Sequence, residues 1–165
     1  GFGASAKWRG FDLNLLFQGV GKSSFFIEGS TVFMFRNGDG GGNVLSQLAN
    51  GNRWIPREIS GTADTEDPNA TYPRLSYGGN NNNQQRSTFW LQDGSYMRLK
   101  TFELGYSLPK KVTRAMYCNN VRVFFIGTNL LTWSGFKLWD PELTSSDGKA
   151  YPLTRSFSLG VTINL

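Results

Sequence analysis

The sequence predicts an all-β fold whose antiparallel strands cross a lipid membrane and are joined on one side by long external loops. Apolar and other residues alternate with a period of two in five segments, at 2–9, 11–20, 95–107, 121–133 and 155–165. The segments have roughly 10 residues, the length of a tilted membrane strand and more than a common soluble strand. Their connections are short, long, medium and long in turn, which is typical of an outer-membrane β-barrel.

The first two segments predict a β-hairpin around Arg9-Gly10, because two alternating runs flank a very short turn signal. The apolar parity holds Phe2, Ala4, Ala6 and Trp8 in the first segment, and Phe11, Leu13, Leu15 and Phe17 in the second.

The stretch 21–94 predicts a long extracellular loop. Runs of glycine and asparagine and several prolines interrupt periodic structure there. Within it, 43–49 predicts a short helix, with Asn43 as its cap and Val44, Leu45 and Leu48 on its apolar face. A connection of about 70 residues is abnormal inside a compact soluble domain, which favours a functional loop.

Alternation returns after this loop. In 95–107 the apolar parity changes between Leu99 and Phe102, which predicts a β-bulge near Lys100-Thr101. The segment 121–133 begins with Val121, Val123 and Phe125 on one face. The last segment alternates most regularly: Phe157, Leu159, Val161, Ile163 and Leu165 share one face, and Ser156, Ser158, Gly160, Thr162 and Asn164 share the other.

Composition excludes most catalytic chemistry. The chain has 165 residues, a net charge of +5, no histidine and one cysteine. A histidine base, a Ser-His-Asp triad, a His or Cys zinc site and an internal disulfide are therefore impossible within it. We predict no enzyme activity and no cofactor. Two acidic groups lack the spacing of a calcium loop and are expected to be solvated: Asp64, Glu66 and Asp67, and Asp140, Glu142 and Asp147.

The apolar faces fit either a soluble core or a lipid bilayer. No apolar run is long enough for a membrane helix, but membrane β-strands turn only every second residue to lipid. Five strands cannot close a membrane barrel, and open edges in hydrocarbon would cost tens of kcal/mol. We therefore expect the remaining strands upstream, in a longer protein, which fits the absence of a signal peptide and an initiating Met.

Several blocks, in order along nearly the whole chain, resemble one family. They are KWRGFDLNLLFQGV at 7–20, NATYPRL at 69–75, FWLQDGSYMRLK at 89–100, ELGYSLP at 103–109, TNLLTW at 128–133, and WDPE at 139–142 with Tyr151-Pro152. In these blocks the chain resembles the C-terminal barrel portion of SusC/RagA-family TonB-dependent outer-membrane transporters.

The resemblance implies the last five strands of a barrel of about 22 strands in the outer membrane of a Gram-negative bacterium. It also implies TonB-driven nutrient uptake, typically of oligosaccharides and sometimes of peptides, with a SusD-like surface lipoprotein. TonB would contact an N-terminal region absent here. The expected further partners are outer-membrane lipid and the barrel assembly machinery, and no nucleic acid.

The candidate functional residues form four groups. An aromatic girdle is predicted at Trp8, Phe11 and Tyr106 on one membrane boundary, and at Trp133, with Phe157, on the other. The barrel insertion signal is predicted at Phe157, Leu159, Val161, Ile163 and Leu165. Ligand contact is predicted at the loop aromatics Trp54, Tyr72, Trp90 and Trp139. A polar barrel interior is predicted at Lys7, Asp12, Asn14, Gln18, Arg122, Thr128, Ser158, Thr162 and Asn164.

Two alternatives remain open from the residues alone. The first is a soluble all-β carbohydrate-binding module that uses the loop aromatics, which a soluble monomer with a cooperative melt would favour. The second is a structural surface protein or adhesin fragment. Lys110, Lys111 and Arg114 are interpreted as a solvated periplasmic turn beside lipid headgroups rather than a nucleic-acid site.

Overall fold

The computed structural model describes residues 1–35, 44–56, 69–143 and 145–165. Two compact units make up the chain. The strand unit consists of residues 1–23, 93–143 and 151–165, and the loop unit of residues 24–92 and 144–150.

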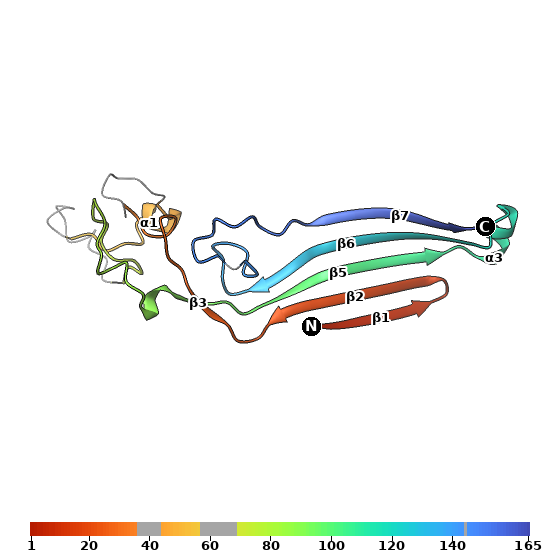
Figure 1. Cartoon of the computed structure of the whole chain (residues 1–165), viewed down its shortest axis with the longest axis horizontal. Helices are drawn as coiled ribbons and strands as arrows, with labels where there is room; N and C mark the ends of the chain where they lie inside the picture. Colours follow the sequence, from red (N-terminus) through yellow and green to blue (C-terminus); the bar gives the residue numbers. More distant parts are fainter. Residues whose placement is uncertain (36–43, 57–68, 144) are drawn as a thin grey trace. The chain divides into compact units, whose positions relative to one another are not determined.

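The strand unit is one antiparallel sheet of five strands in the order β1-β2-β5-β6-β7, which lie side by side in Figure 1. Their bounds are Phe2–Trp8 for β1, Phe11–Val20 for β2, Tyr96–Ser107 for β5, Asn120–Ser134 for β6 and Ser156–Asn164 for β7. The strands coincide with the five alternating segments, and their ends differ by one residue at most. The expected antiparallel, all-β class is confirmed.

The register places the apolar parity of every strand on one face of the sheet. A single row of partners runs Ala6, Leu13, Leu104, Phe125 and Leu159 across all five strands. Alternate residues must point to opposite faces, so the intervening residues form a second, more polar face. One row on that face runs Asn14, Glu103, Ile126 and Ser158.

The apolar face is extensively exposed. Leu159 and Phe157 on β7 expose 78% and 66% of their surface, and Trp8 on β1 exposes 67%. Large apolar side chains in a soluble sheet are normally covered by a second layer. In the described part of the chain, these side chains therefore remain exposed, unlike the apolar face of a soluble sheet.

The expected bulge is present and falls at Lys100. The β5–β6 register shifts between Leu99 and Thr101, and the β2–β5 register shifts opposite, between Leu16 and Phe17. Lys100 pairs with neither neighbouring strand: it is an extra residue relative to β2, whereas β6 leaves two residues, Asn129 and Leu130, unpaired opposite it. The bulge explains why the apolar parity changes in the middle of β5.

Two short connections lie at the same end of the sheet. Arg9 and Gly10 join β1 to β2 with φ angles of 47° and 92°, as a type I′ hairpin requires. The second connection, between β5 and β6, holds a short helix, α3 (Lys110–Ala115), where a turn was expected. Because Trp8 pairs with Phe11, and Phe11 with Tyr106, both connections leave the sheet at this end.

The loop unit has its own small apolar core. Ile27, Val32, Phe33, Leu48 and Trp90 are buried. Strand β3 (Ser24–Phe26) pairs with β4 (Leu91–Asp93), and a 3-10 turn, η2 (Thr88–Trp90), precedes β4. The segment expected to be a long loop with one short helix thus also contains a packed core, to which its aromatic side chains contribute.

The short helix of this unit, α1 (Ser46–Ala49), begins later than the sequence predicted. Leu45 is its extended N-cap residue, and Asn43, the predicted cap, lies outside the described residues. Only Leu48 of the helix is buried, so a single side chain rather than an apolar face attaches it. Among the described residues, no helix is long and apolar enough to cross a membrane.

Candidate functional site

Three of the predicted girdle residues form one row at the short-connection end of the sheet. Trp8 pairs with Phe11, Phe11 pairs with Tyr106, and the rings of Phe11 and Tyr106 are 4.5 Å apart between centroids. All three lie on the apolar face because they have the same parity as its other residues. The strand register thus confirms that these three residues are neighbours, whereas the sequence indicated only that each lies near the end of its strand.

Trp133 lies toward the opposite end, with two aromatic neighbours that the sequence analysis did not assign to the girdle. Its ring is 6.5 Å from that of Phe17, which stacks on Phe2 at 4.9 Å. Phe157 does not join this group, because β7 starts opposite Thr128 and pairs Phe157 with Gly127. Phe157 packs instead beside Phe125, with ring centroids 6.1 Å apart.

The predicted insertion-signal residues occupy one face at the outer edge of the sheet. Phe157, Leu159, Val161 and Ile163 are all more than half exposed on β7, and Leu165 follows the strand with 89% exposure. Their alternation with Ser156, Ser158, Gly160, Thr162 and Asn164 leaves β7 with one apolar face and one polar face.

The polar face carries a charged cluster that spans three strands. Arg122 on β6 donates hydrogen bonds to Asp12 on β2, through Nε at 3.0 Å, and to Glu103 on β5 at 2.5 Å. Gly105 of β5 lies beneath this contact, where a Cβ would collide with the guanidinium and with Asp12. The predicted interior residues Asp12 and Arg122 therefore bind each other, and Glu103, which the sequence analysis did not select, completes the cluster.

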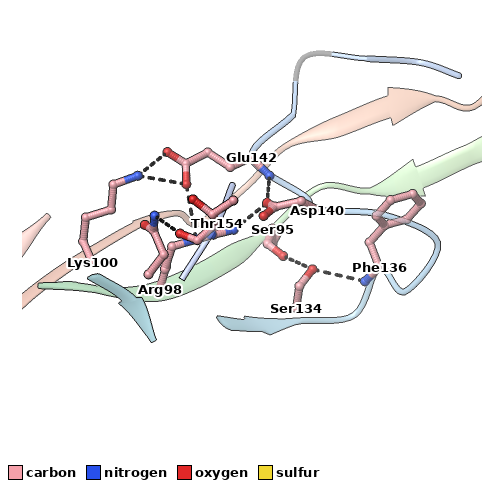
Figure 2. Close-up of polar contacts among 9 residues, drawn as sticks. Ser95, Arg98, Lys100, Ser134, Phe136, Asp140, Glu142 and Thr154 are labelled. Atoms are coloured by element: carbon pink, nitrogen blue, oxygen red, sulfur yellow. Dashed lines mark hydrogen bonds and ion pairs between the residues drawn. The ribbon is translucent and has the colours of Figure 1, made fainter. Parts of the chain in front are cut away.

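A second charged cluster attaches the loop after β6 to the bulged strand β5 (Figure 2). Arg98, which is 2% exposed, donates to Asp140 at 2.5 Å and forms an ion pair with Glu142 at 3.2 Å. Lys100, at the bulge, donates to Glu142 at 2.9 Å. The segment WDPE thus lies against β5 through its two carboxylates.

The electrostatics of Asp140 follow from this arrangement. Burial alone would raise its pKa, but hydrogen bonds from the Arg98 guanidinium and the Glu142 amide, together with the charges of Arg98 and Lys100, hold the pKa below its usual value. Asp140 therefore stays ionised, and its carboxylate is occupied by donors from the chain itself.

Three of the four predicted ligand-contact aromatics line one open cavity in the loop unit, with a volume of about 600 Å³. Trp54 and Tyr72 are held together by a backbone hydrogen bond of 3.0 Å from Trp54 to Tyr72. Phe89 packs edge-on against both Tyr72 and Trp90. The cavity wall also includes Asn83 and Arg86, which offer polar groups beside flat rings.

The cavity aromatics differ in what they can do. Trp90 is 3% exposed, and its indole nitrogen donates to the Asn83 carbonyl at 2.7 Å, so it mainly supports the wall. Trp54 is 37% exposed and can present a ring to a ligand. Arg86 donates two hydrogen bonds to Glu28, at 2.9 and 3.0 Å, which neutralise its charge. Uncharged rings, amides and hydroxyls therefore dominate this cavity.

Trp139 lies elsewhere, in the strand unit. It packs edge-on against Phe136 at 4.9 Å and borders a smaller cavity of about 240 Å³ with Arg98 and Asp140. The sequence therefore predicted an aromatic set that the structure divides between two places.

The described acidic groups are already engaged. Asp140 and Glu142 bind Arg98 and Lys100, and Asp147 accepts a hydrogen bond from Ser145 at 2.7 Å. Within the described residues no group of His, Cys, Asp or Glu side chains is placed to hold a metal ion. Asp64, Glu66 and Asp67 lie outside those residues.

Comparison with known proteins relates the chain to TonB-dependent receptors. No protein-family model matches it. It is similar to TonB-dependent receptor P26 and TonB-dependent receptor P3 of Formosa agariphila, at 27% and 26% identity over 176 aligned residues. These matches cover 99% of the chain, and the chain spans 16% of the length of either relative.

Solved structures of the RagAB peptide importer have a similar fold. The open-open state matches with a TM-score of 0.71 at 25% identity, over 99% of this chain and 16% of that chain. The closed-closed state matches with a TM-score of 0.70 at 24% identity, over 98% of this chain and 16% of that chain. The resemblance to TonB-dependent receptors of the RagA type, indicated by the sequence blocks, is confirmed.

Proposed function

We propose that this chain supplies five adjacent strands to the β-barrel of a TonB-dependent nutrient transporter in the outer membrane of a Gram-negative bacterium. The observation that carries the proposal is the exposed apolar face, which continues across all five strands of the sheet. Acyl chains would cover that face, and the opposite polar face would line the barrel interior.

The edges of the sheet support membership of a larger barrel. β1 and β7 each have a neighbouring strand on one side only. Each unpaired backbone group in hydrocarbon costs several kcal/mol, so the edges need partner strands. We assign those strands to other parts of a longer polypeptide, as the 16% coverage of the relatives suggests. A barrel of about 22 strands is the size known for outer-membrane transporters.

The connections give the proposed orientation. Outer-membrane barrels have short turns on the periplasmic side and longer loops outside. The Arg9-Gly10 turn and the α3 connection would therefore face the periplasm. Trp8, Phe11 and Tyr106 would form the periplasmic aromatic girdle, and Trp133 would belong to the outer one.

The cargo we propose is an oligosaccharide or a peptide. In the cavity of the loop unit, Trp54 and Tyr72 offer flat rings that can stack on sugars, with amide groups beside them, and the buried Trp90 supports the cavity wall. Trp139 is proposed as a separate ligand contact within the strand unit, beside its own smaller cavity. The similarity to a structure described as a peptide importer supports the peptide alternative.

The remaining roles belong to partners outside the chain. A SusD-like lipoprotein would cover the outer opening, and TonB would act through an N-terminal region absent here. Phe157, Leu159, Val161, Ile163 and Leu165 would be recognised by the barrel assembly machinery. We assign this chain neither a catalytic step nor a cofactor, and no nucleic-acid partner.

Cysteine scanning of β7 in the longer transporter tests the membrane assignment. In a Cys118→Ser background, a fluorescent label is attached at Leu159→Cys or at Val161→Cys. Brominated acyl chains should quench the fluorescence of either label. Their neighbours Ser158→Cys and Thr162→Cys should instead react with a bulky water-soluble maleimide that enters the barrel. Each pair is a matched control, because the residues adjoin along one strand and differ in the face they occupy.

A different labelling result would contradict the membrane assignment. The proposal would be overturned if the cysteines on both faces reacted equally with the water-soluble maleimide and the protein were recovered from the soluble fraction as a monomer. That result would favour the soluble all-β carbohydrate-binding module. Uptake of labelled oligosaccharides and peptides, each with and without dissipation of the proton motive force, then identifies the cargo class.

A further inference from the structure

The short-connection end of the sheet changes from apolar to aromatic to cationic over a short distance. The apolar face ends in the row Trp8, Phe11 and Tyr106. Arg9 follows Trp8 in the turn, and its guanidinium carbon is 5.0 Å from the centre of the Trp8 ring. A membrane interface has the same order of acyl chains, interfacial region and headgroups.

Helix α3, at the same end of the sheet, adds exposed basic side chains and exposed apolar side chains. Lys110, Lys111 and Arg114 are exposed, and their spacing of three and four residues places them together on one side. Val112 and Met116 are also four residues apart and expose 42% and 50% of their surface. Only Thr113 of this helix is buried.

Tyr117, which follows the C-cap residue of the helix, adds another exposed side chain to this connection. It is 93% exposed and has a φ of 57°, in the left-handed region that a non-glycine residue rarely adopts. An exposed Tyr ring with a polar hydroxyl suits the boundary between hydrocarbon and water. We call Arg9, Lys110, Lys111, Arg114, Val112, Met116 and Tyr117 the α3 surface.

The cations of the α3 surface lack acidic partners among the residues that the structure describes. Across those parts of the chain, no ion pair involves Arg9, Lys110, Lys111 or Arg114. The nearest acidic side chains toward this end of the sheet, Asp12 and Glu103, are both bound by Arg122. The surface is therefore positively charged.

We propose that the α3 surface binds the headgroups of anionic phospholipids in the periplasmic leaflet. The basic side chains would contact lipid phosphates, while Val112, Met116 and Tyr117 would contact the upper acyl region. The exposed apolar groups favour a lipid over a free anion, which would leave them in water. This inference rests on the proposed membrane location and adds the lipid class that the barrel selects.

Lipid-selective quenching at Cys118 tests the inference. The longer transporter, with Cys118 as its only cysteine, would be labelled with a bimane fluorophore and placed in phosphatidylcholine nanodiscs. Brominated phosphatidylglycerol should quench the label at a mole fraction at least tenfold lower than brominated phosphatidylcholine requires. Each basic residue near an anionic surface strengthens binding about fivefold, so several together give such a preference.

Charge variants assign the preference to α3. K110Q/K111Q/R114Q should lose the preference, and the charge-retaining K110R/K111R/R114K should keep it. K22Q/K137Q/R155Q is the matched control, because it removes three exposed cations at the opposite strand ends. Equal quenching by the two lipids in the unaltered protein, or an equal loss in the control variant, would overturn the inference.

Two further measurements separate the possible causes. Calorimetry with inorganic phosphate in detergent should detect no saturable binding; saturable binding that K110Q/K111Q/R114Q abolishes would make this a free-anion site and contradict us. A bimane label at Val161→Cys in a Cys118→Ser background reports membrane location itself. Quenching there without lipid selectivity at Cys118 refutes the headgroup inference alone, whereas no quenching at either place refutes the membrane location.

Discussion

Arg122 on β6 reaches past Gly105 of β5 and binds Asp12 on β2, two strands away in the sheet. Only a residue without a side chain at position 105 leaves room for this contact, because a Cβ would meet both partners. The contact joins residues that are 110 positions apart in the sequence. It therefore fixes the relative position of the hairpin and β6 on the polar face.

Gly105→Ala should uncouple Asp12 from Arg122. A double-mutant cycle with Asp12→Asn and Arg122→Gln should give a coupling free energy of about 1–2 kcal/mol when Gly105 is present, and close to zero when it is replaced. Chemical denaturation of the folded transporter measures each corner of the cycle. Persistence of the full coupling in the Gly105→Ala background would show that the guanidinium reaches Asp12 by another path.

Acidification should release the WDPE segment from β5. The pKa of Asp140 in the folded protein lies below the unfolded value of about 3.9, so its stabilisation is complete above that value. It is lost as the pH falls through the lower, folded pKa. Hydrogen exchange of residues 135–143, corrected for intrinsic rates, should therefore increase sharply below about pH 4.

Asp140→Asn provides the control for that effect. It should weaken the attachment already at neutral pH and remove the step in exchange at acidic pH, while β6 amides remain protected in both proteins. A step of unchanged size in Asp140→Asn would assign the titration to another group.

Phe157→Asp should lower the folded yield of the proposed transporter. It places a charge on the apolar face of β7, where acidic residues in lipid cost about 1–3 kcal/mol depending on depth. Heat-modifiable migration of outer-membrane fractions measures the folded share. Ser158→Asp, on the polar face of the same strand, should have much less effect, and an equal loss in both variants would contradict the assigned faces.

Trp54→Ala should weaken cargo binding with little change in folding, because its ring is partly exposed in the cavity wall. We expect a loss of affinity of roughly tenfold, equivalent to about 1.4 kcal/mol. Tyr77→Ala removes an exposed aromatic ring of the loop unit outside this cavity and should leave affinity unchanged. Equilibrium binding of the cargo identified by the uptake assay provides the measurement.

Trp90→Ala should behave differently, since the buried indole supports Phe33, Phe89 and the Asn83 carbonyl. It should expose the loop unit to proteolysis as well as reduce binding. Equal effects of Trp54→Ala and Trp90→Ala on proteolysis would show that Trp54 also has a structural role.

Local sequence predicted the strands well, because a period of two depends only on which neighbours along the chain are apolar. It located the bulge near Lys100 for the same reason, from the change of parity between Leu99 and Phe102. It did not predict helix α3, where polar residues after Pro109 resemble a turn. Burial of Thr113 helps to attach that short helix, and nothing in its immediate neighbours indicates that burial.

The sequence predicted which residues belong to the candidate sites, but it did not predict which of them lie together in space. Alternation assigned Asp12 and Arg122 to the polar face, but their contact depends on β2 and β6 both lying beside β5. Trp54, Tyr72 and Trp90 were selected as loop aromatics, and only packing across dozens of residues brings them to one cavity. The same packing leaves Trp139 in the other unit.

The sequence by itself determined which residues become strands and which side chains share a face, because backbone pleating converts local alternation directly into sidedness. Tertiary structure alone decided which strands beyond the first hairpin are neighbours, which carboxylates Arg98 and Arg122 bind, and which of the described cations remain without an acidic partner. The side-chain contacts among them join residues 19 to 110 positions apart, whose distances only the folded chain can set.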